Sequence, residues 1–422
     1  MDKKRGDGRR TLRLTRSQEQ HFGSAQAHSC AGEPTATVSR RLPLSMRITT
    51  LLRIIVFGLL LSIVILNWLW PLPLPVAVKL LVAVFIIVAS QFQFWSRLSS
   101  GSIFAPEFPK PLIILFNWAV GTILFLTLFQ LALDLGALTV ALVRWQPVHI
   151  GTEARIAVGG LAGLLAGIGV ANALRLPPVR DVTVTIRGLS PLFDGYRLLQ
   201  LSDLHITRLF SAGWAARVVA RANAADADLI VVTGDFIDGS VEMRRADIAP
   251  LAGLRAPDGV LAAPGNHEYF FDYAAWMRHL SALGFDMLEN QHKVVTRDTA
   301  HLVIAGVTDR SAHGHSQMGP DLDAALAGCP AHAPVVLLDH QPGDARAAAA
   351  RGVALQLSGH THGGMIRGLD RLVARGNNGF VSGRYQVSGM TLYVSNGTGL
   401  WPGFALRLGV PSEITRFHLR AG

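Results

Sequence analysis

The sequence of 422 residues predicts an α/β domain that is preceded by an all-α transmembrane region of about four helices. Three observations lead to this prediction. Long apolar stretches are confined to residues 50–175, short strand-like runs alternate with helical stretches from about residue 180, and five of those runs end directly in Asp, His or Asn. The chain is therefore expected to divide into residues 1–47, 48–176 and 180–422.

Residues 1–47 are expected to form a disordered basic tail. This segment contains most of the formal net charge of +10 and has no apolar periodicity. Met46 begins the segment "MRITTLLRIIVF" and is an alternative initiator methionine. A misassigned start of translation therefore explains the residues before Met46 as well as a disordered tail does. The remainder of the chain is nearly balanced in charge, which argues against specific nucleic-acid binding. The two cysteines lie far apart and do not suggest a disulfide framework.

Four apolar stretches in the transmembrane region approach the ~20 residues that are needed to cross a bilayer. They are residues 54–70, 76–95, 111–133 and 156–174. The apolar run after Asp134 is too short for another crossing and is expected to extend the third helix. In the fourth stretch, glycine recurs every four residues at Gly159, Gly163 and Gly167. This repeat either allows close helix packing or reflects the abundance of glycine in membrane helices.

Basic residues at the ends of these stretches predict the orientation. Arg47 and Arg53 flank the start of the first stretch, and Arg175 follows the fourth. With the N-terminus inside, four crossings place the C-terminal domain in the cytoplasm, at a bacterial inner membrane. Arg144 and Arg155 would then lie outside, which weakens the assignment, and a miscount by one helix would reverse it.

The C-terminal half contains nine short runs that are predicted as strands. They are residues 182–186, 196–202, 229–234, 259–265, 302–306, 334–339, 354–359, 391–396 and 413–419. Residues 212–225 and 273–284 have the apolar spacing of amphipathic helices. This alternation indicates helices that pack on the outside of a central sheet structure.

Five of these strands end in residues that commonly bind metals. The residues are Asp203 and His205, Asp235 and Asp238, Asn266, His267 and Glu268, Asp339 and His340, and His360 and His362. A single Asp-x-His after a strand is usually a turn, but five such groups in order are not explained by chance. Because sites in α/β folds are built at strand ends, we expect these side chains to converge on one crevice.

The residue types at the strand ends favour a pair of divalent cations. Imidazole and carboxylate donors suit Mn, Fe, Zn or Co, and the lack of Cys donors argues against a structural zinc site. Two adjacent dications repel each other strongly, so a shared carboxylate is needed to screen them. His360 and His362 are close enough in the chain to serve adjacent metals.

These stretches, ending in "GHTHGG", resemble the motifs of the calcineurin-like metallophosphoesterases. The similarity is greatest to the membrane-associated bacterial YaeI/YkuE-like phosphodiesterases, and it covers about residues 180–420. The resemblance implies a four-layer αββα sandwich with a dinuclear site at the strand ends. The transmembrane region takes no part in it.

The resemblance also implies a role for individual residues. Seven of them would hold metal: Asp203, His205 and His362 the first ion, Asn266, His340 and His360 the second, and Asp235 both. His267 would protonate the leaving group or stabilise the transition state, and Asp238 would orient a histidine or a backbone turn. A hydroxide activated by the two cations would attack phosphorus.

The implied activity is the metal-dependent hydrolysis of a phosphate ester or pyrophosphate. Proximity to the bilayer favours a lipid-linked substrate. A soluble nucleotide or cyclic phosphodiester, or a non-catalytic metal-binding membrane sensor, are the alternatives. Arg367 and Arg375 either hold a second phosphate or lipid headgroup, or belong to a solvent-facing hairpin.

Overall fold

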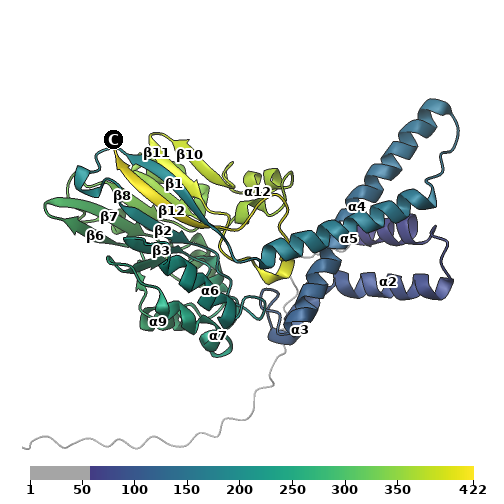
Figure 1. Cartoon of the computed structure of the whole chain (residues 1–422), viewed down its shortest axis with the longest axis horizontal. Helices are drawn as coiled ribbons and strands as arrows, with labels where there is room; N and C mark the ends of the chain where they lie inside the picture. The colour runs from purple at the N-terminus through teal and green to yellow at the C-terminus, as the bar shows by residue number, and fades with distance from the viewer. Residues whose placement is uncertain (1–57) are drawn as a thin grey trace, which may run out of the picture. The chain divides into compact units, whose positions relative to one another are not determined.

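The computed structural model describes residues 58–422 (Figure 1). The predicted basic tail of residues 1–47, the alternative start at Met46 and the beginning of the apolar stretch 54–70 lie outside the described residues. The described chain begins with a group of apolar helices and continues into a domain with two mixed β-sheets.

The N-terminal helices supply two candidate membrane spans. The helices are Gly58–Leu69, which becomes a π-helix over Ile63–Leu69, α2 (Val76–Ser90), α3 (Phe92–Ser100), α4 (Lys110–Arg144) and α5 (Thr152–Leu174). By length and composition α4 and α5 could each cross a membrane. Helices α2 and α3 are bent by 55° and add a third span only if the pair acts as one. The described residues therefore contain two candidate spans, or three with the bent pair, and do not confirm the expected four.

Helix α4 is longer than the stretch 111–133 that predicts it. It continues through Asp134 to a length of 35 residues, as expected for the apolar run that follows, because Leu, Ala and Val extend a helix without a proline to end it. The Asp134 carboxylate accepts hydrogen bonds from Asn67 Nδ2 at 2.8 Å and Gln130 Nε2 at 2.7 Å. These amides satisfy a carboxylate that would otherwise be costly in an apolar region.

In the glycine repeat of α5, only Gly159 lies where a larger residue would clash, because Cβ atoms at Gly163 and Gly167 would lie 3.6 and 3.8 Å from Trp118, which is an ordinary contact distance. A Cβ atom at Gly159 would come within 2.6 Å of the Trp68 ring. Two glycines outside the repeat, Gly121 of α4 and Gly169 of α5, make close contacts, since a Cβ atom there would lie 2.5 and 2.6 Å from Leu406. Leu406 belongs to the C-terminal domain, so a loop of that domain is packed between the two candidate spans.

Two six-stranded sheets form the core of the C-terminal domain (Figure 1). The first sheet has the order β1 (Val179–Ile186), β12 (Ile414–Ala421), β2 (Arg197–Leu201), β3 (Leu229–Thr233), β4 (Val260–Ala263) and β5 (Asp286–Met287). The second has the order β10 (Gly383–Val387), β11 (Met390–Val394), β9 (Leu355–Ser358), β8 (Val335–Leu338), β7 (Ala300–Gly306) and β6 (Gln291–Arg297). Strands β2 to β5 are parallel, and so are β7, β8, β9 and β11.

Alternate residues of the central strands enter different cores. Leu229 and Val231 of β3 lie between the two sheets, whereas Ile230 and Val232 lie between the first sheet and its helices. This follows from the period of two in a strand that is buried on both faces. The resulting order of layers is helices, sheet, sheet, helices.

The outer layers are made of short helices. Helices α6 (Ala212–Asn223), α7 (Val241–Ile248) and α9 (Tyr273–Ala282) lie together beside the first sheet, and Trp276 of α9 is fully buried against it (Figure 1). The second sheet is covered by α10 (Leu322–Leu326) and α11 (Ala345–Ala350). The remaining helices are α8 (Asn266–Phe270) and α12 (Asp370–Gly376).

All nine predicted strands are present, but β5, β6 and β10 were not predicted. Each of these three lies at the edge of a sheet. Strand β6 pairs only with β7, and several of its polar side chains are exposed, so it lacks the apolar run that identifies a buried strand.

Candidate metal centre

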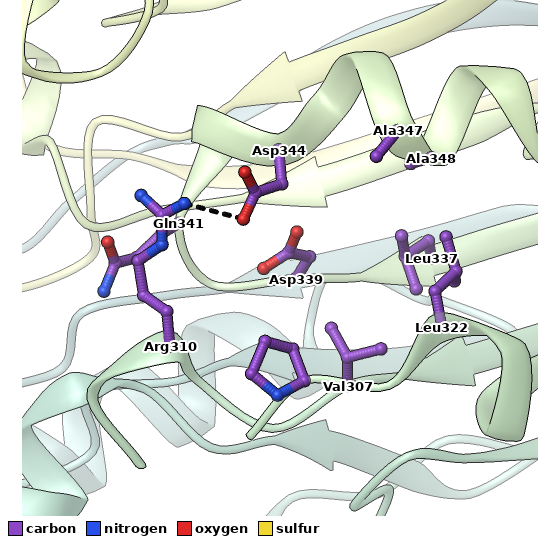
Figure 2. A pocket seen from close by; sticks show the side chains of 10 residues that line it. Val307, Arg310, Leu322, Leu337, Asp339, Gln341, Asp344, Ala347 and Ala348 are labelled. Carbon is purple, nitrogen blue, oxygen red and sulfur yellow. Dashed lines mark hydrogen bonds and ion pairs between the residues drawn. The ribbon is translucent and has the colours of Figure 1, made fainter. Parts of the chain in front are cut away.

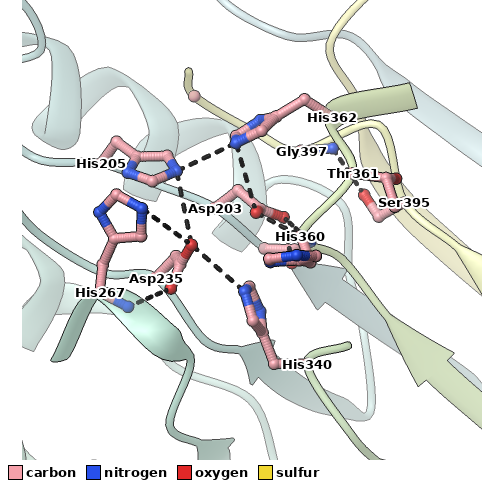
Figure 3. A network of polar contacts seen from close by, with 12 residues as sticks. Asp203, His205, Asp235, His267, His340, His360, Thr361, His362, Ser395 and Gly397 are labelled. Carbon is pink, nitrogen blue, oxygen red and sulfur yellow. Dashed lines mark hydrogen bonds and ion pairs between the residues drawn. The ribbon is translucent and has the colours of Figure 1, made fainter. Parts of the chain in front are cut away.

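The strand ends of both sheets bring the predicted donors to one place (Figure 3). In the first sheet, the loops after the parallel neighbours β2, β3 and β4 carry Asp203, Asp235 and Asn266. In the second sheet, the loops after β8 and β9 carry His340 and His360. Because the carboxyl ends of parallel strands share one edge, five segments of distant sequence meet there.

One group of donors consists of Asp203, His205 and His362, and all three are buried. Their donor atoms lie within 4.8 Å of one another. The Nε2 atoms of His205 and His362 are 3.2 Å apart, and His362 Nε2 is 3.6 Å from an Asp203 carboxylate oxygen. This is the set that the resemblance to the metallophosphoesterases implies for a first ion.

A second group consists of Asp235, His340 and His360. His340 Nε2 lies 3.2 Å from Asp235 Oδ2 and 3.0 Å from Asn266 Oδ1. His360 Nδ1 lies 2.8 Å from the same Asn266 oxygen. Asp235 Oδ2 is also 3.7 Å from His205 Nε2, so this carboxylate lies between the two groups.

These atoms fit a cation site better than a network of ordinary hydrogen bonds. Burial lowers the pKa of His340, but Asp235 outweighs it and raises this pKa well above its usual value, so His340 carries a proton until a cation replaces it. His340 Nδ1 donates to the Thr233 carbonyl at 2.7 Å, which leaves Nε2 to offer its lone pair to that cation. That lone pair faces the oxygens of Asp235 and Asn266, which are acceptors as well. Electron-rich atoms that face one another need a proton or a cation between them. The donor set therefore suits divalent metal ions.

His267 and Asp238 form a third arrangement beside these groups. Asp238 is fully buried; one of its oxygens lies 3.0 Å from His205 Nδ1, and the other makes a short hydrogen bond with His267 Nδ1. The backbone N–H of His267 donates to Asp235 Oδ1 at 2.9 Å. Asp238 therefore orients one imidazole of the first donor group and also His267, whose Nε2 remains 3.8 Å from Asp235.

In the metal centre, charge interactions oppose the effect of burial on the pKa values of Asp235 and His267. Burial alone would raise the pKa of Asp235, but His340 and His267 outweigh it and hold this pKa well below its usual value. Burial would lower the pKa of His267, but Asp235 and Asp238 raise it to about 9. Burial and the charge of His340 lower the pKa of His360 to about 3, so the His360 ring is neutral and able to donate a lone pair.

The backbone is also unusual at the donors. Asp203, His205, Asp235, His360 and His362 all have positive φ, between 46° and 69°. Such conformations are uncommon for residues other than glycine and are concentrated at functional sites. At Gly265 a Cβ atom would come within 2.3 Å of the Asp235 carboxylate, so the loop after β4 can approach that carboxylate only as glycine.

Glu268 is buried and supports the loops rather than joining a donor group. Its carboxylate accepts hydrogen bonds from the backbone N–H groups of Asp235 at 3.1 Å, Phe236 at 2.8 Å and Gly265 at 2.7 Å. Burial, with repulsion from Asp235, raises the pKa of Glu268 to about 7. The sequence placed this residue among the possible donors without indicating its structural use.

Asp339 lines a different cavity, of about 180 Å³, together with Arg310, Gln341 and Asp344 (Figure 2). Arg310 and Asp344 form an ion pair of 2.7 Å at that cavity. Burial and the charge of Asp309 raise the pKa of Asp339 to about 8. Asp339 and His340 directly follow β8, and only His340 lies among the donor groups.

Arg367 and Arg375 lie in the segment between β9 and β10. Arg367 is exposed, and its guanidinium donates to the Gly409 carbonyl at 3.1 Å. Arg375 is exposed in the last turn of α12. The segment is a short helix followed by the β10–β11 hairpin, and a phosphate-binding role for these two arginines stays a prediction.

Two residues near the centre were missed by the sequence analysis. Arg407 is buried and donates to the His362 carbonyl at 3.1 Å and the Asn396 carbonyl at 2.6 Å. The ring centroid of Phe104, from the connection between α3 and α4, is 5.0 Å from that of His267. Neither residue stands in a motif, so the sequence contained no signal for them.

Comparison with known proteins places this arrangement in context. The family model described as calcineurin-like phosphoesterase matches residues 196–364. The chain is 34% identical to a zebrafish (Danio rerio) protein described as a transmembrane protein with metallophosphoesterase domain, over 62% of this chain and 61% of the other. The corresponding cattle (Bos taurus) protein is 35% identical over 61% and 60% of the two chains. The chain thus spans about three fifths of the length of these relatives.

A bacterial relative is matched over almost its whole length. The uncharacterised metallophosphoesterase YkuE of Bacillus subtilis is 32% identical over 62% of this chain and 94% of its own.

Proposed function

We propose that the chain, which belongs to the calcineurin-like phosphoesterase family, is a metal-dependent hydrolase that cleaves a phosphate ester or pyrophosphate at a membrane surface. The membrane assignment is supported by the two candidate spans α4 and α5 and by the relatives described as transmembrane proteins. The proposal treats residues 48–176 as the membrane region and 180–422 as the catalytic domain.

Seven side chains are proposed to hold two divalent metal ions. They are Asp203, His205 and His362 for one ion, Asn266, His340 and His360 for the other, and Asp235 for both. The observation that carries this assignment is the position of the Asp235 carboxylate, 3.7 Å from His205 Nε2 on one side and 3.2 Å from His340 Nε2 on the other. When bound, such a metal pair supplies Lewis acidity at the phosphoryl oxygens and lowers the pKa of bound water.

His267 is proposed to hold the proton that the leaving group needs. Its Nδ1 is fixed by Asp238, which leaves Nε2 directed toward the metal centre. The carboxylates of Asp235 and Asp238 favour the imidazolium, as the pKa of about 9 indicates. Asp238 positions the ring, and Glu268 and Arg407 hold the loops that carry the donors.

A catalytic domain on the cytoplasmic side of a bacterial inner membrane remains our proposal for the topology, on the basis of the flanking arginines. The loop that contains Leu406 is inserted between α4 and α5, and this close attachment supports a substrate that is presented at the bilayer. A lipid-linked phosphate is therefore favoured over a soluble nucleotide or cyclic diester.

The activity can be tested with purified full-length protein and a chromogenic diester. Protein loaded with Mn²⁺ should hydrolyse bis-p-nitrophenyl phosphate, and removal of metal with a chelator should stop turnover until Mn²⁺ is restored. Protein that retains two metal ions per chain but hydrolyses neither this diester nor p-nitrophenyl phosphate would disprove catalysis and favour the metal-binding sensor.

A further inference from the structure

One part of the N-terminal helical region reaches the metal centre. The connection between α3 and α4 carries Phe104, whose ring meets His267 edge-on with the centroids 5.0 Å apart. The same ring is stacked on Phe270 at 4.9 Å and lies 5.6 Å from the ring of Trp401. These three rings come from three distant segments: the helical region, α8 and the loop after β11.

The aromatic cluster is accessible from outside. Phe104, Phe270 and Trp401 are each only partly buried, whereas His267 behind them is buried. Partly exposed aromatic rings beside convergent buried polar side chains are a common composition for a ligand site. These rings therefore form an apolar wall next to the centre, on the side of His267.

The connection is held in place by charge. Glu107, three residues after Phe104, forms ion pairs with Arg208 at 2.9 Å and with the buried guanidinium of Arg244. Arg244 Nε in turn donates to the Asp238 carbonyl at 2.9 Å. Since the Asp238 carboxylate holds His267, the same residue fixes the catalytic imidazole and, through Arg244 and Glu107, the wall next to it.

A second apolar site, at the candidate spans, is formed in part by a residue close to Trp401 in the sequence. Three residues after Trp401, Phe404 lines a cavity of about 290 Å³ together with apolar residues of α4 and of the first helix. The residues of that cavity include Leu60, Leu61, Val120, Ile123, Leu124 and Leu128. Residues 401–404 therefore connect the aromatic cluster beside His267 with an apolar cavity of the membrane region.

We propose that Phe104, Phe270 and Trp401 form a subsite for a hydrocarbon chain of a membrane lipid, carried on the ester group next to His267. This inference rests on the proposed function, because it uses His267 to identify the leaving-group side. It assigns to the helical region a direct part in substrate binding, in addition to attachment to the membrane.

The test compares binding of two non-hydrolysable probes, ethylphosphonate and hexylphosphonate, to Mn²⁺-loaded full-length protein in lipid nanodiscs. Each buried methylene group tightens binding by roughly fourfold, so partial burial of the longer chain should give hexylphosphonate an advantage of about tenfold or more. In Phe104→Ala this ratio should fall to about one to three. Phe270→Ala should reduce it independently if Phe104→Ala does not fold.

Phe94→Ala is the matched control, because Phe94 is an exposed phenylalanine of α3 and lies in the same helical region. It should leave the chain-length ratio and the hydrolysis of bis-p-nitrophenyl phosphate unchanged. A ratio that is the same in wild type, Phe104→Ala and Phe270→Ala would overturn the subsite. Because the readout is binding, the subsite can fail while the wild type still hydrolyses the diester, and hydrolysis can fail while the ratio still depends on Phe104.

Discussion

The C-terminal domain and the N-terminal helices are specified by the sequence in different ways. In the domain, each donor follows a strand, and the parallel pairing of those strands brings the donors together. In the helices, apolar composition gives length and approximate position, but it does not determine how a helix bends or what it contacts. The polar residues at strand ends therefore identify a functional site in the sequence, whereas apolar residues identify only a helix or a strand.

The largest effect is expected for a substitution in the donor groups of the C-terminal domain. Asp235→Asn removes the carboxylate charge that lies between the two donor groups, so the repulsion between two dications would no longer be screened. We expect turnover of bis-p-nitrophenyl phosphate to fall below detection and the metal content to fall below two ions per chain. Full metal content and normal turnover in this variant would show that Asp235 is not shared.

The His267→Ala variant distinguishes a role of His267 in proton transfer from a role as a metal ligand. His267 lies beside the donor groups but is proposed to handle a proton, so the variant should retain its metal while kcat falls by ~10²–10⁴-fold. Metal analysis and steady-state kinetics on the same preparation provide the check. If the variant lost its metal instead, His267 would be a ligand and the assigned role would be wrong.

Leu406→Ala tests whether the contact between the C-terminal domain and the helices α4 and α5 stabilises the protein. Leu406 is fully buried against Gly121 and Gly169, and its truncation should cost about 2–5 kcal/mol, as for other large-to-small core changes. Thermal unfolding in nanodiscs should show a lower midpoint, while the metal content at low temperature should remain at two ions per chain. The exposed residue Leu372 provides the control, because Leu372→Ala should leave the midpoint unchanged.

The smallest effect is expected at the surface of the domain. Hydrogen bonds from Arg416 and then His418 lower the pKa of Asp181 from about 3.8 to about 2. The corresponding stabilisation is present above pH ~4 and is lost as the pH falls through about 2. Because Asp181 is half exposed, Asp181→Asn should cost less than ~1 kcal/mol at neutral pH. If Asp181→Asn lowered the free energy of unfolding equally at pH 7 and at pH 2, this explanation of the Asp181 contribution would be contradicted.

The sequence could predict much of the domain because its signals are local. Nine strands were identified from apolar runs, and the residues at five strand ends were identified from residue type. The edge strands β5, β6 and β10 were missed since they are short or partly exposed. The bend between α2 and α3 was missed because the apolar stretch 76–95 continues across it.

The remaining features of the site depend on tertiary packing. Phe104 and Arg407 are far from the strand-end motifs in sequence, and their contacts with His267 and the His362 carbonyl exist only after folding. Asp339 and Glu268 stand within the motifs, but side-chain direction separates them from the donor groups. Residue type therefore identified the centre, and the fold determined which neighbours support it.

The position of bound metal tests the central claim most directly. Anomalous diffraction from Mn²⁺-soaked crystals should give two strong peaks per chain, one among Asp203, His205 and His362 and the other among Asn266, His340 and His360, with Asp235 touching both. A single peak, or two peaks away from Asp235, would contradict the account.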